Sequence, residues 1–179
     1  MSEHKKVMIS STVRDLPEHR KMVMHACMRM GMFHPEMMEH LTATDATPVQ
    51  TSLMMVDKSE LYICILGFRY GYVPPKKRFS ITEMEYNRAV KRGIPRLVFL
   101  MSDEHPVTIK EVETGLGAKK LEKFKERLKN DLVVSFFKSP DELLAQVIQA
   151  LVPYRASNIS TSHYLIEKSN ENRTMITAN

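Results

Sequence analysis

The stretch that decides the fold runs from residue 61 to residue 101 and reads "LYICILGFRYGYVPPKKRFSITEMEYNRAVKRGIPRLVFLM". It begins with an apolar run over 61–68 and ends with another over 95–101. Short apolar runs without polar alternation are typical of strands that are covered on both faces. The polar segment between them has a helical pattern that ends before Gly93. The stretch therefore predicts strand, helix, strand, which is the repeating unit of a parallel sheet.

The rest of the chain repeats this alternation. Five strand–helix units predict an α/β domain, a flavodoxin-like three-layer sandwich whose five-stranded parallel sheet has the order 2-1-3-4-5. The domain takes up residues 1–152, and residues 153–179 read as a polar tail or linker. The other expected strands are 5–11, 33–38 and 132–137, and the other expected helices are 16–31, 47–59, 117–130 and 139–152.

Composition limits the class of protein. A chain of 179 residues with 43% hydrophobic and 26% charged residues suits one globular domain. No segment approaches the roughly 18 apolar residues that span a membrane, and none resembles a secretory signal. Cys27 and Cys64 lie in apolar segments, which favours buried free thiols in a reducing compartment. We therefore expect a cytoplasmic protein without a membrane partner.

The net charge of +5 is compatible with phosphorylated ligands or acidic partners. Much of the excess positive charge lies in 119–130. There apolar residues recur at helical spacing on one side, and the lysines cover the other side, which indicates an amphipathic helix with a solvated face. Its one aromatic residue, Phe124, falls on the apolar side, so the segment lacks the interleaved exposed aromatic residues of single-strand binders and we expect no direct nucleic-acid binding.

Familiar signatures are absent. The chain has neither GxxxxGK[ST] nor a GxGxxG after its first strand. The glycines of "TGLGAKK" (114–120) are interpreted as a flexible loop rather than a phosphate cradle. "HPEMMEH" (34–40) gathers His and Glu residues but has no third ligand cluster, so we assign no metal site.

Ligands of open parallel sheets bind beyond the carboxyl ends of the strands. After the first strand this places Ser10, Ser11, Arg14 and Asp15 at the ligand end. These polar groups suit either a cap of the following helix or a cradle for phosphate and ribose. The two interpretations have equal support from the residues.

The segment after the third strand supplies Gly67, Arg69, Tyr70 and Tyr72. Two tyrosines and several cations at the ligand end suit stacking on a planar base and attraction of an anionic ligand. A solvated proline-containing turn explains the same composition, so both interpretations stay open.

Two glutamates near the start of the next helix differ in their expected positions. "SITE" is a capping box, in which Ser80 is the N-cap and Glu83 reaches back to the Ser80 amide. At about 100° per residue, Glu85 falls between Ile81 and Ala89, on the apolar side of the helix. Its carboxylate should therefore point toward the sheet at the ligand end.

A carboxylate in that position stays ionised if the helix dipole outweighs desolvation. It can then stabilise an oxocarbenium ion or attack a sugar carbon. The alternative is an internal ion pair between Glu85 and Arg88, three residues on.

Four segments carry a resemblance to a known family. They are "VMISSTVRDLPEHR" (7–20), "SLMMVDKSELYICILGFRYGYVP" (52–74), "SITEMEYNRAVKRGIPRLVFLM" (80–101) and "KSPDELLAQVIQAL" (138–151). With these segments, the sequence resembles over residues 5–152 an uncharacterised prokaryotic domain family of the TIR-like superclass, which includes nucleoside deoxyribosyltransferases. Such domains often precede NACHT or other STAND NTPases.

The resemblance implies a chemistry. Many members of the superclass cleave N-glycosidic bonds, and TIR enzymes cleave that of NAD. Their glutamate precedes a small residue by four positions and a glycine by eight, as Glu85 precedes Ala89 and Gly93. The resemblance and the helical geometry therefore indicate the same carboxylate.

The leading hypothesis is a TIR-like effector or signalling domain that cleaves NAD or a related nucleotide and needs no further cofactor. The resemblance implies bacterial defence, activation by assembly into a homo-oligomer, and a STAND or NACHT-type NTPase as partner or fused domain. Ser10, Ser11 and Arg14 would hold phosphate or ribose, and Tyr70 and Tyr72 would line the base pocket. A non-catalytic assembly module and a nucleotide sensor without turnover are the alternatives.

Overall fold

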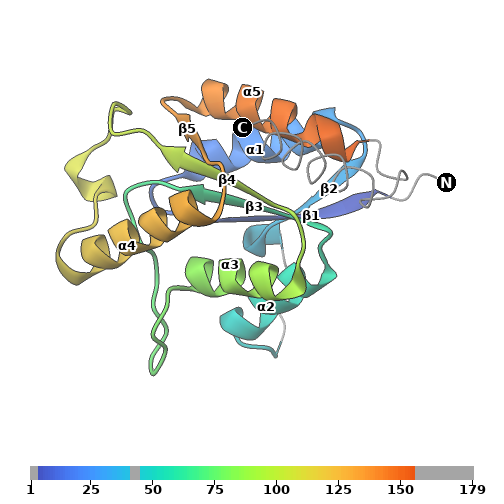
Figure 1. Cartoon of the computed structure of the whole chain (residues 1–179). Helices are drawn as coiled ribbons and strands as arrows, with labels where there is room; N and C mark the ends of the chain where they lie inside the picture. The colour runs from blue at the N-terminus through green and yellow to red at the C-terminus, as the bar shows by residue number, and fades with distance from the viewer. Residues whose placement is uncertain (1–3, 41–44, 156–179) are drawn as a thin grey trace, which may run out of the picture.

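Within the residues that the structure describes, five strands alternate with five α-helices, as the sequence predicts (Figure 1). The computed structural model describes residues 4–40 and 45–155. Most of the predicted tail, residues 156–179, therefore lies outside the described residues. The elements are β1 Lys5–Ser11, α1 Pro17–Arg29, β2 Phe33–Glu36, α2 Pro48–Lys58, β3 Leu61–Leu66, α3 Ile81–Arg92, β4 Arg96–Met101, α4 Gly115–Asp131, β5 Ser135–Phe137 and α5 Pro140–Leu151.

The strands form one sheet with the order β2-β1-β3-β4-β5, and every pairing in it is parallel. Ile9 pairs with Ile63, and Ile63 pairs with Leu97, so β3 lies at the centre. Helices α1 and α5 cover one face of the sheet, while α2, α3 and α4 cover the other (Figure 1). The predicted three-layer fold and its strand order are confirmed.

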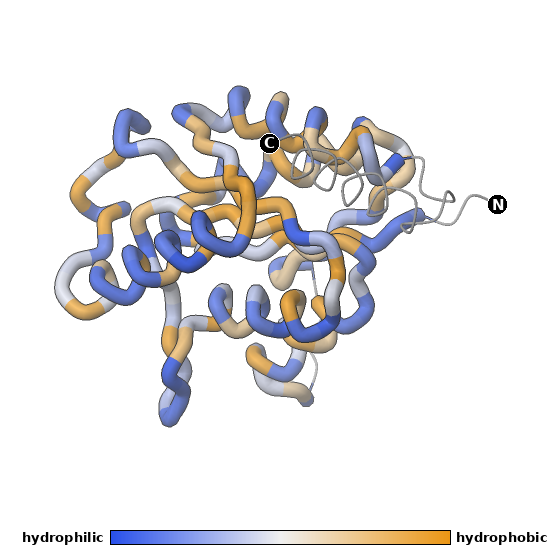
Figure 2. The backbone as a smooth tube through the Cα atoms, viewed as in Figure 1, coloured by the Kyte–Doolittle hydropathy of each residue, from blue (hydrophilic) through white to orange (hydrophobic). Residues whose placement is uncertain are grey.

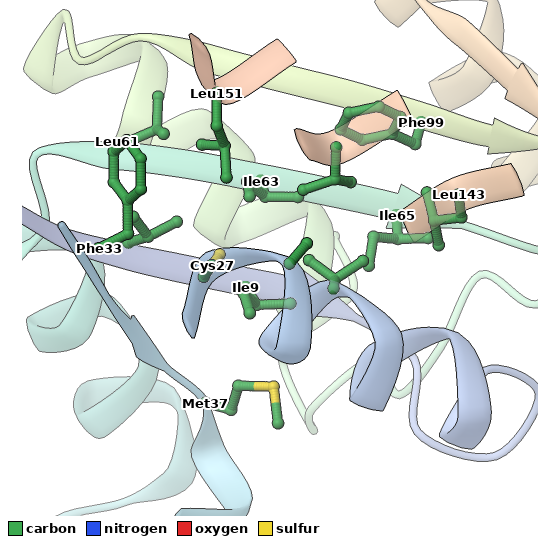
Figure 3. Close-up of a cluster of buried hydrophobic side chains, with 14 of the residues drawn as sticks. Ile9, Cys27, Phe33, Met37, Leu61, Ile63, Ile65, Phe99, Leu143 and Leu151 are labelled. Atoms are coloured by element: carbon green, nitrogen blue, oxygen red, sulfur yellow. The ribbon is translucent and has the colours of Figure 1, made fainter. Parts of the chain in front are cut away.

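The central strand shows why its sequence has no polar alternation. All six residues of β3 are buried. Leu61, Ile63 and Ile65 pack in the cluster under α1 and α5 (Figure 3), whereas Tyr62 and Cys64 pack in the cluster on the opposite face. Hydrophobic residues are accordingly concentrated in the middle of the fold, and hydrophilic ones on the outer turns (Figure 2).

Local signals set both ends of α3 and the start of α5. The Ser80 side chain accepts a hydrogen bond from the Glu83 amide and starts α3, and Gly93 ends that helix with φ +65°. The Ser139 side chain caps α5 in the same way, as predicted.

Several element boundaries differ from the sequence-based expectations. Strand β2 ends at Glu36 and β3 at Leu66, each two residues early, and the last strand covers only Ser135–Phe137, because Leu132 is the C-cap of α4. Helix α4 begins at Gly115, with Thr114 as N-cap, two residues before the expected start at residue 117, so both glycines of 114–120 lie in the helix rather than in a flexible loop before it. Cys27 and Cys64 are free and buried, as predicted. None of the described helices is long and apolar enough to cross a membrane.

Candidate functional site

A cleft of about 790 Å³ opens where β1 and β3 end, which is the ligand end of a parallel sheet. The segments that follow both strands, the start of α3 and the start of α4 form its walls. Of the residues predicted to bind substrate, the cleft brings together Ser10, Ser11, Arg14, Arg69, Tyr70 and Tyr72, and it includes Glu85. The other lining residues are Thr12, Val13, Arg20, Met38, Gly71, Val73, Ile81, Thr82, Glu113, Leu116, Gly117 and Lys120.

Glu85 lies at the floor of this cleft on the second turn of α3. Its side chain is 4% exposed, and its Oε2 accepts a hydrogen bond from the Ser10 hydroxyl at the end of β1. Burial raises the pKa of Glu85 to about 7, although hydrogen bonds from Ser10 and Ser52 and the charge of Arg20 act in the opposite direction. Desolvation therefore outweighs the groups that stabilise the ionised form, so the condition under which the carboxylate would stay fully ionised is not met.

The alternative role for Glu85, an ion pair with Arg88, is wrong. The Arg88 guanidinium donates from Nε and Nη2 to the two carboxylate oxygens of Asp57, at 2.7 and 2.6 Å. This bidentate pair ties α3 to α2 on the side away from the sheet. Glu85 is thus buried without an ion-pair partner on α3, and burial raises its pKa more than the hydroxyls of Ser10 and Ser52 lower it.

Arg20 is a site residue that the sequence analysis missed. It is 4% exposed on the first turn of α1. One guanidinium nitrogen donates to the Ser11 hydroxyl at 2.6 Å, and the other two donate to Glu39 at 2.8 and 2.5 Å. Arg20 therefore fixes the end of β1 while Glu39 neutralises its charge. Helical geometry could have found it, because Arg20 occupies nearly the same turn of α1 as Glu85 does of α3.

Tyr70 has a different role from the stacking that the sequence suggests. Its side chain is 2% exposed and leaves little ring surface for a ligand. Its hydroxyl donates to Glu83 Oε2 and accepts from the Ser80 amide at 3.3 Å. Tyr72, at 65% exposure on the rim, is the tyrosine with a free ring face.

The same contacts correct the predicted capping box. Ser80 accepts from the Glu83 amide as expected, but the Tyr70 hydroxyl occupies the place between Glu83 and the Ser80 amide. Glu83 is also buried rather than facing solvent, because α4 covers that side of α3 and Arg127 pairs with the carboxylate at 3.2 Å. Local pattern alone could not show a helix packed alongside.

Asp15 and Gly67, both predicted to bind substrate, lie outside the lining of the cleft. Asp15 is buried and accepts a hydrogen bond from the Thr12 hydroxyl. A Cβ at position 67 would lie 2.6 Å from Asp15 Oδ2, so the glycine makes room for this carboxylate. Asp15 does not cap the next helix either, since Leu16 is the N-cap of α1 and no side chain caps it. The close approach of Asp15 and Gly67 therefore packs the segments that follow β1 and β3 against each other.

Glu113, also missed, bonds the backbone after β3. Its Oε2 accepts from the amides of Tyr70 at 2.6 Å and Gly71 at 3.4 Å. Gly71 has φ +88°, a conformation that favours glycine. The Glu113 side chain comes from a segment 42 and 43 residues further on, so no local signal marks the contact.

The cleft has an excess of positive charge. Its described lining holds four cationic side chains, Arg14, Arg20, Arg69 and Lys120, and only the carboxylates Glu85 and Glu113. Such a wall attracts anionic ligands. Within the described residues no group of three or more His, Cys, Asp and Glu side chains is placed to hold a metal ion.

In a comparison with known protein families, residues 6–152 match the family described as a domain of unknown function, DUF4062. The chain belongs to the DUF4062 family. Among solved structures, this DUF4062 domain is similar to the flavodoxin-like domain of a Synechococcus sp. protein. The TM-score is 0.39 at 11% sequence identity, covering 83% of this chain and 98% of that one. No curated protein matches the sequence.

Proposed function

We propose that this DUF4062 domain cleaves the N-glycosidic bond of NAD or a related nucleotide, with Glu85 as the catalytic carboxylate. The observation that carries the proposal is the position of Glu85. It is a buried carboxylate with a pKa near 7 at the floor of a cation-lined cleft, at the ligand end of a parallel sheet. The resemblance to TIR-like glycosidases, which selects the same residue, gives independent support.

The chemistry requires little from the protein beyond charge and position. The bond between C1′ of the ribose and the pyridinium nitrogen breaks, and its electron pair leaves with neutral nicotinamide. Water adds to C1′ and releases a proton. Ionised Glu85 stabilises the oxocarbenium-like transition state and accepts that proton from the attacking water. A carboxylate with a pKa near 7 is well matched to both tasks at neutral pH.

The other cleft residues divide the binding tasks. Ser11 and Arg14 lie beside Ser10 at the end of β1, where their donors suit the ribose hydroxyls. Tyr72 offers an exposed ring at the rim for stacking on the base. Tyr70 holds the start of α3, and thereby Glu85, in place.

In the biological context that we propose, the domain is a cytoplasmic TIR-like effector of prokaryotic defence. Self-association activates it, and a STAND or NACHT-type NTPase is its partner or neighbouring domain. Exposed apolar side chains on the segments around the cleft support self-association through this end of the molecule. They are Val13, Tyr72, Ile109 and Leu116.

A nucleotide sensor without turnover is the second candidate. The observation that favours it is the enclosure of Glu85, which is 4% exposed and hydrogen-bonded by Ser10. If a bound nucleotide does not reach the carboxylate, the cleft binds its ligand and leaves it intact.

One experiment separates the two. Concentrated protein is incubated with NAD while nicotinamide release is followed by chromatography, and NAD binding is measured in parallel by calorimetry. Nicotinamide release that Glu85→Gln abolishes supports the glycosidase. Binding of intact NAD by both forms, without release, supports the sensor, and a folded protein that neither binds nor cleaves NAD contradicts both.

A further inference from the structure

Glu113 forms part of the cleft wall, yet it contributes a negative charge to a cleft that is otherwise rich in cations. Its carboxylate forms no ion pair within the described residues and is held by the backbone amides of Tyr70 and Gly71. Successive N–H groups that converge on one point form a general binding site for anions. The structure therefore contains an anion site that is filled by the chain's own carboxylate.

The segment that carries Glu113 lies across the end of β3. The Glu113 amide donates to the Phe68 carbonyl at 2.9 Å, and Arg69 donates to the Lys110 carbonyl at 3.2 Å. These contacts keep the segment in place through its backbone. The Glu113 carboxylate can therefore leave the two amides by side-chain rotation, without loss of the backbone contacts.

Two cations of the same cleft, Arg69 and Lys120, form no ion pair within the described residues, although the charge of Arg69 lowers the pKa of the buried Asp15. Within the part of the chain that the structure describes, Arg69 and Lys120 donate only to backbone carbonyls, those of Lys110 and Arg78. The diphosphate of a dinucleotide carries two negative charges and four non-bridging acceptor oxygens, against one charge and two oxygens for a carboxylate. It can take the amides of Tyr70 and Gly71 and also engage these two cations.

Helix α4 leaves room for the carboxylate. A Cβ at Gly117 would lie 2.2 Å from Glu113 Oε1, so any other residue at this position would push the carboxylate aside. Gly117 lies in the first turn of α4, whose first turn contains no acidic residue. Glu113 thus occupies a place next to a positive helix end, which favours any anion there.

We infer that the amides of Tyr70 and Gly71, with Arg69 and Lys120, are the subsite for the phosphate groups of the nucleotide, and that Glu113 occupies it until the ligand displaces it. This inference rests on the proposed function in that it names the subsite of the same cleft. It assigns a position to the phosphates and makes Glu113 an internal competitor for them.

The test uses inorganic pyrophosphate as the probe, because it has no glycosidic bond and reports on the subsite alone. Binding to the full chain is measured by calorimetry for wild type, Glu113→Ala and Glu113→Gln. Glu111→Ala is the matched control, since Glu111 lies in the same segment but bonds Thr108 and does not line the cleft. Circular dichroism verifies that each variant is folded.

Removal of the competing carboxylate should tighten pyrophosphate binding about tenfold, as expected for loss of one charged hydrogen-bond acceptor from the site. Glu113→Gln should change affinity in the same direction, and Glu111→Ala should bind as wild type does. Folded Glu113 variants that bind pyrophosphate no more tightly than wild type would overturn the inference. If both Glu113 variants fail to fold, the carboxylate is a fixed anchor that no ligand displaces, which also overturns it. If the Glu113 variants bind pyrophosphate more tightly but the protein releases no nicotinamide from NAD, the phosphate subsite is supported and the proposed glycosidase activity is contradicted.

Discussion

The Ser10 hydroxyl donates a hydrogen bond to Glu85 Oε2 and so joins the end of β1 to α3 across 75 residues of sequence. Both groups are almost fully buried, and both line the cleft. The contact lowers the pKa of Glu85, which burial has raised to about 7. The protonation state of the proposed catalytic group therefore depends on a residue from a different strand.

Ser10→Ala should move the pH dependence of catalysis upward. The ionised form of Glu85 is the active one, so the rate should rise with pH through the Glu85 pKa. Loss of the Ser10 donor should shift the midpoint of nicotinamide release from about pH 7 upward by roughly one to two units, because a hydrogen bond to a charged group contributes about 1.5–3 kcal/mol. An unchanged midpoint in the folded variant would show that Ser10 does not tune Glu85.

Glu85→Gln should stabilise the protein at neutral and alkaline pH, and the gain should disappear as pH falls from about 7 to below 4.5. The folded-state pKa of Glu85 is raised above its ordinary value of 4.5 to about 7. Below pH 4.5 the group is protonated in both the folded and the unfolded chain; as pH rises toward 7, the unfolded chain ionises first and folding becomes less favourable. Thermal unfolding should therefore show a higher Tm for Glu85→Gln than for wild type at pH 8 and a smaller difference at pH 4.5. A difference that does not vary with pH would contradict the raised pKa.

Tyr70→Phe should destabilise the fold by about 1–3 kcal/mol, because removal of the hydroxyl leaves the Ser80 amide and the Glu83 carboxylate without a shared buried partner. Tyr72→Phe is the matched control, since Tyr72 is 65% exposed and should keep wild-type stability. Urea unfolding of both variants measures the difference. Equal stability of the two would mean that the Tyr70 hydroxyl does not hold α3.

Gly71→Ala should cost more stability than Gly93→Ala, although both glycines have a positive φ. At Gly93 nothing lies within 4 Å of an added Cβ, so only the left-handed backbone conformation destabilises the alanine variant, by about 1–2 kcal/mol. At Gly71 the added Cβ would also lie 2.8 Å from Thr12 Cγ2, which adds about 1–3 kcal/mol of crowding. Chemical denaturation of both variants tests this order, and a Gly71→Ala no less stable than Gly93→Ala would contradict the crowding.

The sequence predicts the fold well because its signals are local. The buried run of β3, the Ser80 cap and the Gly93 stop each lie within one element, and parallel topology follows from their alternation. Where the prediction of the fold was wrong, the cause is a contact that the local pattern does not show. Residues 114–120 look flexible because of their glycines, but Gly117 serves close packing against Glu113 inside a helix.

The sequence could predict a residue of the candidate site only where its position on a helix or at a strand end determines which way its side chain points. These rules place Glu85, Ser10 and Ser11 in the cleft. They do not show that Glu113 reaches Tyr70 from a segment far along the chain, or that α4 buries Glu83. Such contacts depend on how separate segments pack, which no short pattern contains.

The most direct test of the central claim is the rate of nicotinamide release from NAD by concentrated protein at pH 8, compared between wild type and Glu85→Gln. The matched control is Glu18→Gln, which changes an exposed carboxylate of α1. We predict that wild type and Glu18→Gln release nicotinamide at similar rates and that Glu85→Gln is at least about 100-fold slower, the usual effect of removing a general base. Equal rates in all three proteins, or no release by folded wild type that binds NAD, would contradict the assignment of Glu85 as the catalytic residue.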